Sequence, residues 1–240
     1  MCRLALFNKE GVNYIESNYG LTDFFNYLET SQGGHGNGYC IIYDNGKIRI
    51  KKGITLLNTE ITADILKDYQ NIKWVMYHTR LASMGNISNE NCHPFKCEKS
   101  VLMMNGTERG IRAFIKENKT DTETILNICV MLGINITEAT KNLNSVFVGY
   151  DNGRVFANRN NGSLEYLHHN SKTIIFASEF LPEQYKNDNV YISPLYWKEG
   201  EKIDIKQLKK AKEKTDKWKS CFLDDDDDYY TVYKNYGFLK

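Results

Sequence analysis

The stretch Met1-Cys2-Arg3-Leu4-Ala5-Leu6-Phe7 opens the chain and is the centre of its interpretation. Its apolar residues favour a strand over residues 2–7, which would hold Cys2 at a fixed sheet end. Removal of Met1, a common step before a residue as small as Cys, would give Cys2 a free α-amine beside its thiol. A thiolate is a strong nucleophile, and an N-terminal amine with a pKa of roughly 7.7–8 can act as its base. Cys2 is therefore a candidate nucleophile.

The overall composition is that of an ordinary globular protein. The chain has 240 residues, of which 41% are hydrophobic and 25% charged, and its net charge is +1. This balance gives no reason to expect binding to nucleic acid or to an anionic membrane. No apolar run approaches the roughly 18 residues of a membrane span, and Arg3 interrupts the short apolar start that a signal peptide would need. We therefore expect a cytoplasmic protein.

The six cysteines are Cys2, Cys40, Cys92, Cys97, Cys129 and Cys221. They form no CxxC pair, so we expect reduced thiols rather than a disulfide scaffold. Cys92-His93 with Cys97 nearby resembles half of a zinc site, but no second pair of ligands has suitable spacing. We therefore predict no metal, and the sequence indicates no other cofactor.

Hydrophobic periodicity predicts strands toward both ends of the chain, with helices between them. Asn45-Gly46 and Asn152-Gly153 are strong signals for the turns of two hairpins. The expected strands cover residues 2–7, 39–44, 47–51, 72–78, 100–104, 145–150, 154–158 and 173–178. This order is neither a regular βαβ alternation nor an all-β chain, so we predict an α+β fold.

Helices are expected over residues 21–31 and 59–70, and from residue 120 to residue 132. Thr22 is a candidate cap for the first, and Thr120 with Glu123 forms a capping-box pattern at the third. Gly133 is expected to end that helix, and Cys129 to be a buried thiol within it. Residues 206–219 predict a Lys-rich helix, and five acids at 224–228 begin a tail for which a solvated, disordered state is favoured over a docking role.

Several short motifs follow Cys2 in a fixed order. They are His78-Thr79-Arg80-Leu81-Ala82-Ser83-Met84-Gly85, Asn91-Cys92-His93-Pro94-Phe95, Asn105-Gly106, Asp121-Thr122-Glu123 and, later, residues 152–159 with 176–179. In this order, after a second-position cysteine, they resemble class II glutamine amidotransferases, which are N-terminal-nucleophile hydrolases that begin with Cys. The resemblance covers about residues 2–205. It implies a four-layer αββα sandwich for an amidotransferase domain at residues 1–205, with the Lys-rich helix and acidic tail at 206–240.

The resemblance implies that the side-chain amide of L-glutamine is hydrolysed to glutamate and ammonia through a thioester on Cys2. The α-amine of Cys2 would activate the thiol and protonate the departing ammonia. The Asn105 side chain and the Gly106 backbone N–H are suited to stabilise the oxyanion. Taken alone, without the neighbouring motifs, Asn105-Gly106 favours a type I′ turn instead.

The substrate is a zwitterion, and two side chains suit its charges. Arg80 can hold the α-carboxylate bidentately, and Asp121 can hold the α-ammonium. The resemblance implies the same roles, with backbone groups near Ser83 and Gly106 assisting. The alternatives are that Arg80 is a surface charge and that Asp121 is a helix N-terminal acid favoured by the dipole. His93 is expected to order its loop rather than to take part in catalysis.

The chain departs from the family pattern at Leu81, Ser83-Met84 and Met104. No acceptor domain follows residue 205, so we expect either a separate acceptor or synthetase subunit for the ammonia, or plain glutaminase activity. Two alternatives stay open. One is a hydrolase of other γ-glutamyl amides or peptides, and the other is a non-catalytic binding module that keeps the fold and retains Met1.

Overall fold

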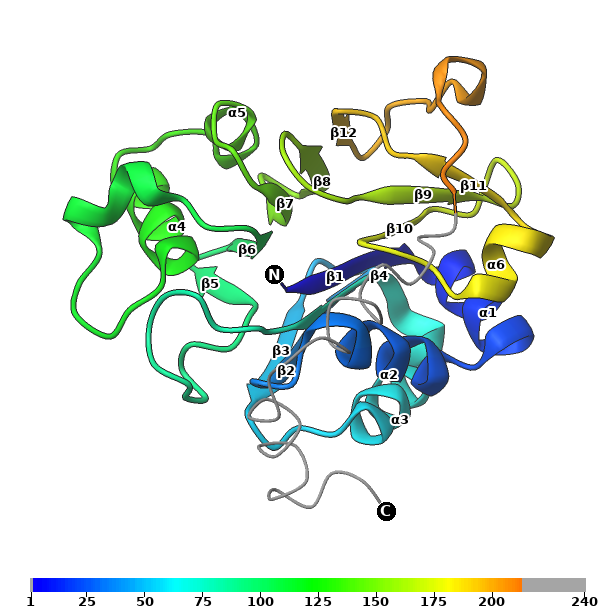
Figure 1. The fold of residues 1–240 in the computed structure, drawn as a ribbon, viewed down its shortest axis with the longest axis horizontal. Coiled ribbons are helices and arrows are strands. Elements are labelled where there is room, and N and C mark those ends of the chain that lie inside the picture. Colours follow the sequence, from blue (N-terminus) through cyan, green and yellow to red (C-terminus); the bar gives the residue numbers. More distant parts are fainter. Residues whose placement is uncertain (1, 213–240) are drawn as a thin grey trace, which may run out of the picture.

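Two antiparallel sheets organise the chain in the computed structural model, which describes residues 2–212 (Figure 1). The first contains β1 (Arg3–Asn8), β2 (Asn37–Tyr43), β3 (Ile48–Gly53), β4 (Ile72–Thr79), β9 (Glu165–His168), β10 (Ile175–Ala177) and β11 (Asn189–Ile192). The second contains β5 (Phe95–Cys97), β6 (Ser100–Asn105), β7 (Val146–Asp151), β8 (Arg154–Arg159) and β12 (Tyr196–Lys198). Their strand orders are β11-β9-β10-β1-β4-β2-β3 and β12-β8-β7-β6-β5, so β1 lies at the centre of the first sheet.

The helices divide between the two sheets (Figure 1). They are α1 (Lys9–Tyr19), α2 (Leu21–Gln32), α3 (Asn58–Asp68), α4 (Asp121–Met131), α5 (Ile136–Lys141) and α6 (Pro182–Asn187), with 3₁₀ turns η1 (Tyr69–Asn71), η2 (Arg109–Phe114) and η3 (Ile205–Gln207). Helices α1, α2 and α3 pack on the first sheet, whereas α4 and α5 pack on the second. The predicted mixture of helices and antiparallel sheets is confirmed.

Side-chain alternation along β1 shows how the layers are built. Ala5 and Phe7 point into the cluster shared with α1, α2 and α3. Leu4 and Leu6 point the other way, into a second cluster between the two sheets. Successive side chains of a strand face opposite sides of the sheet, and this strand is apolar on both, so it is buried on both faces. A third cluster lies on the outer face of the second sheet, where Phe147 packs against α4 and α5.

Most predicted elements are confirmed, including both hairpins, β2–β3 and β7–β8. Thr120 caps α4 by accepting a hydrogen bond from the Glu123 N–H, and Gly133 follows that helix at φ +63°. Cys129 is buried as expected. The predicted cap of α2 is wrong: Gly20 occupies the N-cap position, and the Thr22 hydroxyl instead bonds to a threonine of α3.

The predicted helix at residues 206–219 is wrong where the structure describes it. Residues 205–207 form only a 3₁₀ turn, and the chain then runs extended beside β11. The Ile192 N–H donates to the Lys209 carbonyl at 2.8 Å, and the Ala211 N–H donates to the Val190 carbonyl at 3.0 Å. These edge-strand bonds satisfy backbone groups that would otherwise need other partners. The remainder of this helix and the acidic tail lie outside the described residues.

Candidate active site

Strand pairing brings Cys2 and Arg80 to the same end of the first sheet. β1 and β4 are antiparallel, with Arg3 opposite Thr79, so the residue before β1 and the residue after β4 are neighbours. The Cys2 thiol lies against the backbone of Leu81, whose N–H is 3.4 Å and whose carbonyl oxygen is 3.5 Å from Sγ. The predicted nucleophile and the predicted carboxylate-binding arginine therefore come together.

A cavity of about 20 Å³ lies beside Cys2. Five of the six predicted site residues line it: Cys2, Arg80, Ser83, Gly106 and Asp121. They come from the start of β1, the loop after β4, the end of β6 and the start of α4. Asn105 is not among the lining residues, but it is buried immediately beside them. The structure thus assembles residues that lie up to 119 positions apart in the sequence.

Burial controls the protonation state of the thiol. Desolvation raises the pKa of Cys2, while the Leu81 N–H and the Arg80 guanidinium lower it by smaller amounts. A buried, neutral thiol is a poor nucleophile, because the thiolate is the reactive form. Attack by Cys2 from this position therefore needs a base close to the sulfur.

Arg80 is not a surface charge, because only 2% of it is exposed. Its Nη1 donates to the Asn86 carbonyl at 2.9 Å, and its Nη2 donates to the Met84 carbonyl at 2.7 Å. The guanidinium therefore holds the loop that covers the cavity. These partners are neutral carbonyl groups rather than carboxylates, so the positive charge is not neutralised by an ion pair among the described residues.

Two further contacts hold this loop. The Ser83 hydroxyl lies 2.8 Å from the Thr107 hydroxyl, which joins the loop to the segment after β6. The Ala82 N–H donates to His35 Nδ1 at 2.9 Å. His35 belongs to the glycine-rich segment at 33–38, which packs behind Arg80 and does not line the cavity.

Asn105 and Gly106 do not form a hairpin turn. Asn105 ends β6, and Gly106 has φ +146°, a backbone conformation that side chains rarely allow. A Cβ on Gly106 would lie 2.3 Å from Ser145 Oγ, so the backbone also passes close to its neighbour. The Asn105 side-chain nitrogen lies 3.4 Å from Ser178 Oγ, and its Oδ1 is buried without a hydrogen-bond partner among the described residues.

Asp121 begins α4, as the helix-terminus interpretation expects. Its Oδ2 accepts from the Glu108 N–H at 2.8 Å, and its Oδ1 accepts from the Thr122 N–H at 2.9 Å. Burial nevertheless raises the pKa of this carboxyl group, because desolvation outweighs the bonds to backbone N–H groups. Asp121 therefore places a desolvated acid at the cavity wall.

Comparison with solved structures identifies the fold. One match is glutamine phosphoribosylpyrophosphate amidotransferase from B. subtilis, with a TM-score of 0.50 and 16% sequence identity. Another is described as the allosteric regulatory enzyme of purine biosynthesis, with a TM-score of 0.54 and 17% identity. The fold of this chain is similar to that of a glutamine amidotransferase. In both cases the likeness covers 75% of this chain and 42% of the other. No family model and no curated protein matches the chain.

Within this fold, several residues that support the site have partners that lie far away in the sequence. Arg3 and Glu179 form a buried ion pair at 3.1 Å, and Arg3 also donates to the Cys2 carbonyl at 3.3 Å. Ser178 Oγ accepts from the Leu4 N–H at 3.0 Å and lies beside Asn105. Glu179 and Ser178 stand in a motif that was noted from the sequence, but their partners are more than 70 residues away.

The described part of this fold contains no group of three His, Cys, Asp or Glu side chains placed to hold a metal ion. Cys92, half of the weak zinc pattern, points its thiol at the Ser88 carbonyl at 3.4 Å. Among residues 2–212 all the cysteines are free thiols. No helix in the same part of the chain is long and apolar enough to cross a membrane.

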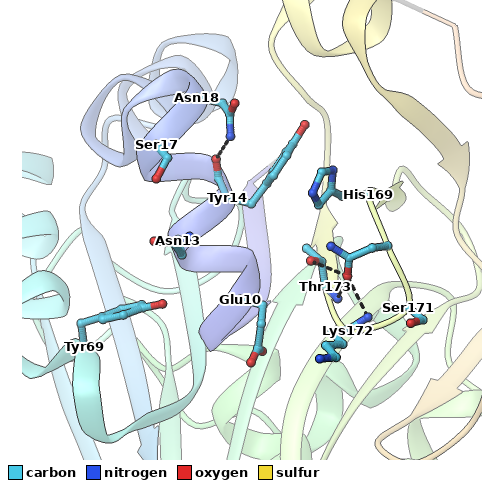
Figure 2. A pocket seen from close by; sticks show the side chains of 11 residues that line it. Glu10, Asn13, Tyr14, Ser17, Asn18, Tyr69, His169, Ser171, Lys172 and Thr173 are labelled. Carbon is cyan, nitrogen blue, oxygen red and sulfur yellow. Dashed lines mark hydrogen bonds between the residues drawn. The ribbon is translucent and has the colours of Figure 1, made fainter.

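A larger depression, of about 700 Å³, lies at the far end of β1 (Figure 2). It lies between α1 and the loop that joins β9 to β10. Two of its lining residues, Tyr14 and His169, pack against each other with ring centroids 4.3 Å apart. None of the predicted site residues lines this depression, so the small cavity beside Cys2 is the better candidate for chemistry.

Proposed function

We propose that this chain hydrolyses the side-chain amide of L-glutamine to glutamate and ammonia, through a thioester on Cys2. The observation that carries the proposal is the meeting of Cys2, Arg80, Ser83, Gly106 and Asp121 around one cavity. The fold also supports the proposal. We interpret the two packed sheets, with the helices on their outer faces, as the four-layer αββα sandwich of N-terminal-nucleophile hydrolases. The ammonia passes to a separate acceptor or synthetase subunit. The reduced cysteines agree with a cytoplasmic enzyme.

In the proposed reaction, removal of Met1 gives Cys2 its α-amine. This amine takes the thiol proton as Sγ attacks the amide carbon. It is therefore the nearby base that a thiol with a raised pKa needs. The carbonyl oxygen becomes an oxyanion that accepts hydrogen bonds from the Asn105 side chain and the Gly106 N–H. The amine then returns its proton to the leaving nitrogen, ammonia departs, and water cleaves the thioester to release glutamate.

Substrate recognition in this proposal uses the buried charges beside Cys2. Arg80 exchanges its bonds to the loop carbonyls for two bonds to the substrate α-carboxylate, which are stronger because both partners are charged. Asp121 accepts from the α-ammonium, whose positive charge favours the ionised form of this carboxyl group. Backbone groups near Ser83, in the loop that covers the cavity, assist in binding the substrate.

The test is intact-mass analysis of the purified protein before and after reaction with 6-diazo-5-oxo-L-norleucine, a glutamine mimic that alkylates such cysteines. We expect loss of Met1 and a single adduct, which is absent in Cys2→Ala. Cys92→Ala is the matched control, because it removes another buried thiol and should leave the adduct in place. Retained Met1 in protein from the native host, or an adduct that persists in Cys2→Ala, would reject the mechanism.

A further inference from the structure

Two imidazoles are stacked beside the end of β6, and one of them, His93, also lines the cavity beside Cys2. The rings of His78 and His93 have centroids 4.0 Å apart and planes at 22°. Both side chains are buried. His78 Nε2 lies 3.1 Å from the Met104 carbonyl oxygen, and His93 Nδ1 lies 3.2 Å from the Met104 backbone nitrogen. The pair therefore binds both backbone polar groups of one residue, and that residue directly precedes Asn105.

Strand pairing explains why Met104 needs these partners. On one side β6 continues beside β7, where Met104 is opposite Phe147. On the other side the pairing with β5 stops at Phe95, which is opposite Leu102. A buried backbone N–H or carbonyl without a partner is costly. At this position the two imidazoles supply the hydrogen-bond partners that a neighbouring strand would otherwise supply.

The bonds to Met104 fix the tautomer of each ring. A carbonyl oxygen only accepts, so His78 carries its proton on Nε2. A backbone N–H only donates, so Nδ1 of His93 is unprotonated and its proton lies on Nε2, which faces Thr122 Oγ1 at 3.4 Å. Burial lowers the pKa of His78 to about 3 and the pKa of His93 well below its ordinary value. Both rings are therefore neutral at pH 7.

We propose that His78 and His93 are positioning residues that hold Met104 from both backbone groups and so set the direction of the Asn105 and Gly106 donors. The inference rests on the function proposed above, in which those donors bind the oxyanion. The two rings reach Met104 from different elements, β4 in one sheet and the segment before β5 in the other. The end of β6 is thereby held relative to β4, which leads directly to Arg80. A shift of about 1 Å at such a point is enough to cost about 100-fold in rate.

Four variants test this inference, because Asn and Gln each mimic one imidazole nitrogen. His93→Asn keeps an acceptor near the position of Nδ1, whereas His93→Gln does not. His78→Gln keeps a donor near the position of Nε2, whereas His78→Asn does not. We expect glutamine hydrolysis with kcat at least about tenfold higher in the matching variant of each pair, with KM changed less than about threefold.

The crossed pattern separates positioning from bulk packing. If side-chain volume alone matters, Gln should exceed Asn at both positions or neither, and that result would overturn the inference. A change confined to KM would also overturn it, since donors to the oxyanion act in the transition state. Wild-type protein that forms no adduct and hydrolyses no glutamine refutes the proposed function instead.

An activity-independent measurement keeps the two failures distinct. The chain has five histidines, so ¹⁵N-labelled imidazoles can be assigned with single His→Gln variants. At pH 7.5 we expect both His78 and His93 as neutral Nε2–H tautomers. Loss of the bond in His93→Gln should shift the Met104 amide resonance, and His93→Asn should shift it less. An Nδ1–H tautomer at either ring, or equal shifts in both variants, would contradict the clamp even in an inactive protein.

Discussion

Gly106→Ala perturbs both features that distinguish the residue after β6. Gly106 has φ +146°, and a Cβ there would lie 2.3 Å from Ser145 Oγ and 2.6 Å from Ser145 Cβ. A non-glycine residue in such a region costs about 1–3 kcal/mol. The clash adds about 1–3 kcal/mol of overpacking. We expect the free energy of unfolding to fall by about 4 kcal/mol in total.

Two companion variants divide this loss into its causes. Ser145→Gly removes the two closest atoms and leaves the Ser145 Cα, at 3.2 Å, as the nearest one, so Gly106→Ala should cost less in that background. Gly133→Ala isolates the backbone term, because Gly133 has φ +63° and a Cβ there meets nothing within 4 Å. It should cost about 1–2 kcal/mol. Urea unfolding followed by circular dichroism measures all of these differences.

The same variants test the oxyanion role of Gly106. Loss of one donor typically lowers kcat by about 10²–10³. Relief of the clash by Ser145→Gly should recover stability but not the backbone direction, so the double variant should stay slow. Two results would refute the reasoning: a stability loss in Gly106→Ala below about 0.5 kcal/mol, or full recovery of turnover in the double variant.

Two further predictions concern buried ionisable groups. The pKa values of His78 and His93 are lower in the folded state, so near and below pH 6.5 the unfolded state binds more protons and stability falls as the pH falls toward the folded values. Between pH 6.5 and pH 5 the two rings should together remove about 3 kcal/mol of stability, measured by urea unfolding. An unchanged pH slope in His78→Gln would contradict this. Glu179→Gln breaks the buried pair with Arg3 and should lower the free energy of unfolding by about 3 kcal/mol. Glu60→Gln breaks an exposed pair with Lys51 and should lower it by less than about 1 kcal/mol. Equal losses in the two variants would show that burial of the pair is irrelevant.

The hairpins were predictable because their turns require special backbone angles. Gly46 and Gly153 have φ +79° and +80°, as turn chemistry demands. Helix α1 was missed because Gly11 interrupts its apolar pattern. Gly11 is needed for a tertiary reason: a Cβ there would lie 2.6 Å from the Ile174 carbonyl oxygen. Its local signal was the cap, since Asn8 accepts a hydrogen bond from the Gly11 N–H.

The candidate site, too, was predictable from the sequence only in part. Cys2 and Arg80 were selected by motif order, but only the register of β1 against β4 makes them neighbours. The ordering role expected for His93 now has a concrete interpretation, the bond to the Met104 N–H. Its stacking partner His78 comes from the other sheet, and no local pattern encodes contacts between sheets.

The cavity beside Cys2 constrains how the proposed reaction can begin. At about 20 Å³ it has room for roughly one water molecule, whereas pockets that bury small ligands span roughly 300–1,000 Å³. Hydrolysis of an amino-acid amide at Cys2 therefore needs more room, which removal of Met1, movement of the loop after β4, or both can provide. Cys2 itself need not move, because β1 is paired on both sides.

The contacts that close this loop differ in strength. The Ser83–Thr107 bond is exposed, and a neutral hydrogen bond contributes only about 1 kcal/mol net. When a carboxylate arrives, Arg80 loses bonds to neutral carbonyl groups and gains a bidentate pair in which both partners are charged. The guanidinium that holds the loop closed is thus also the group that gains bonds to the ligand when the loop opens. If Arg80 binds the substrate as proposed, a ligand without a carboxylate gains nothing from it, and the closed loop should favour ligands that carry one, such as amino acids.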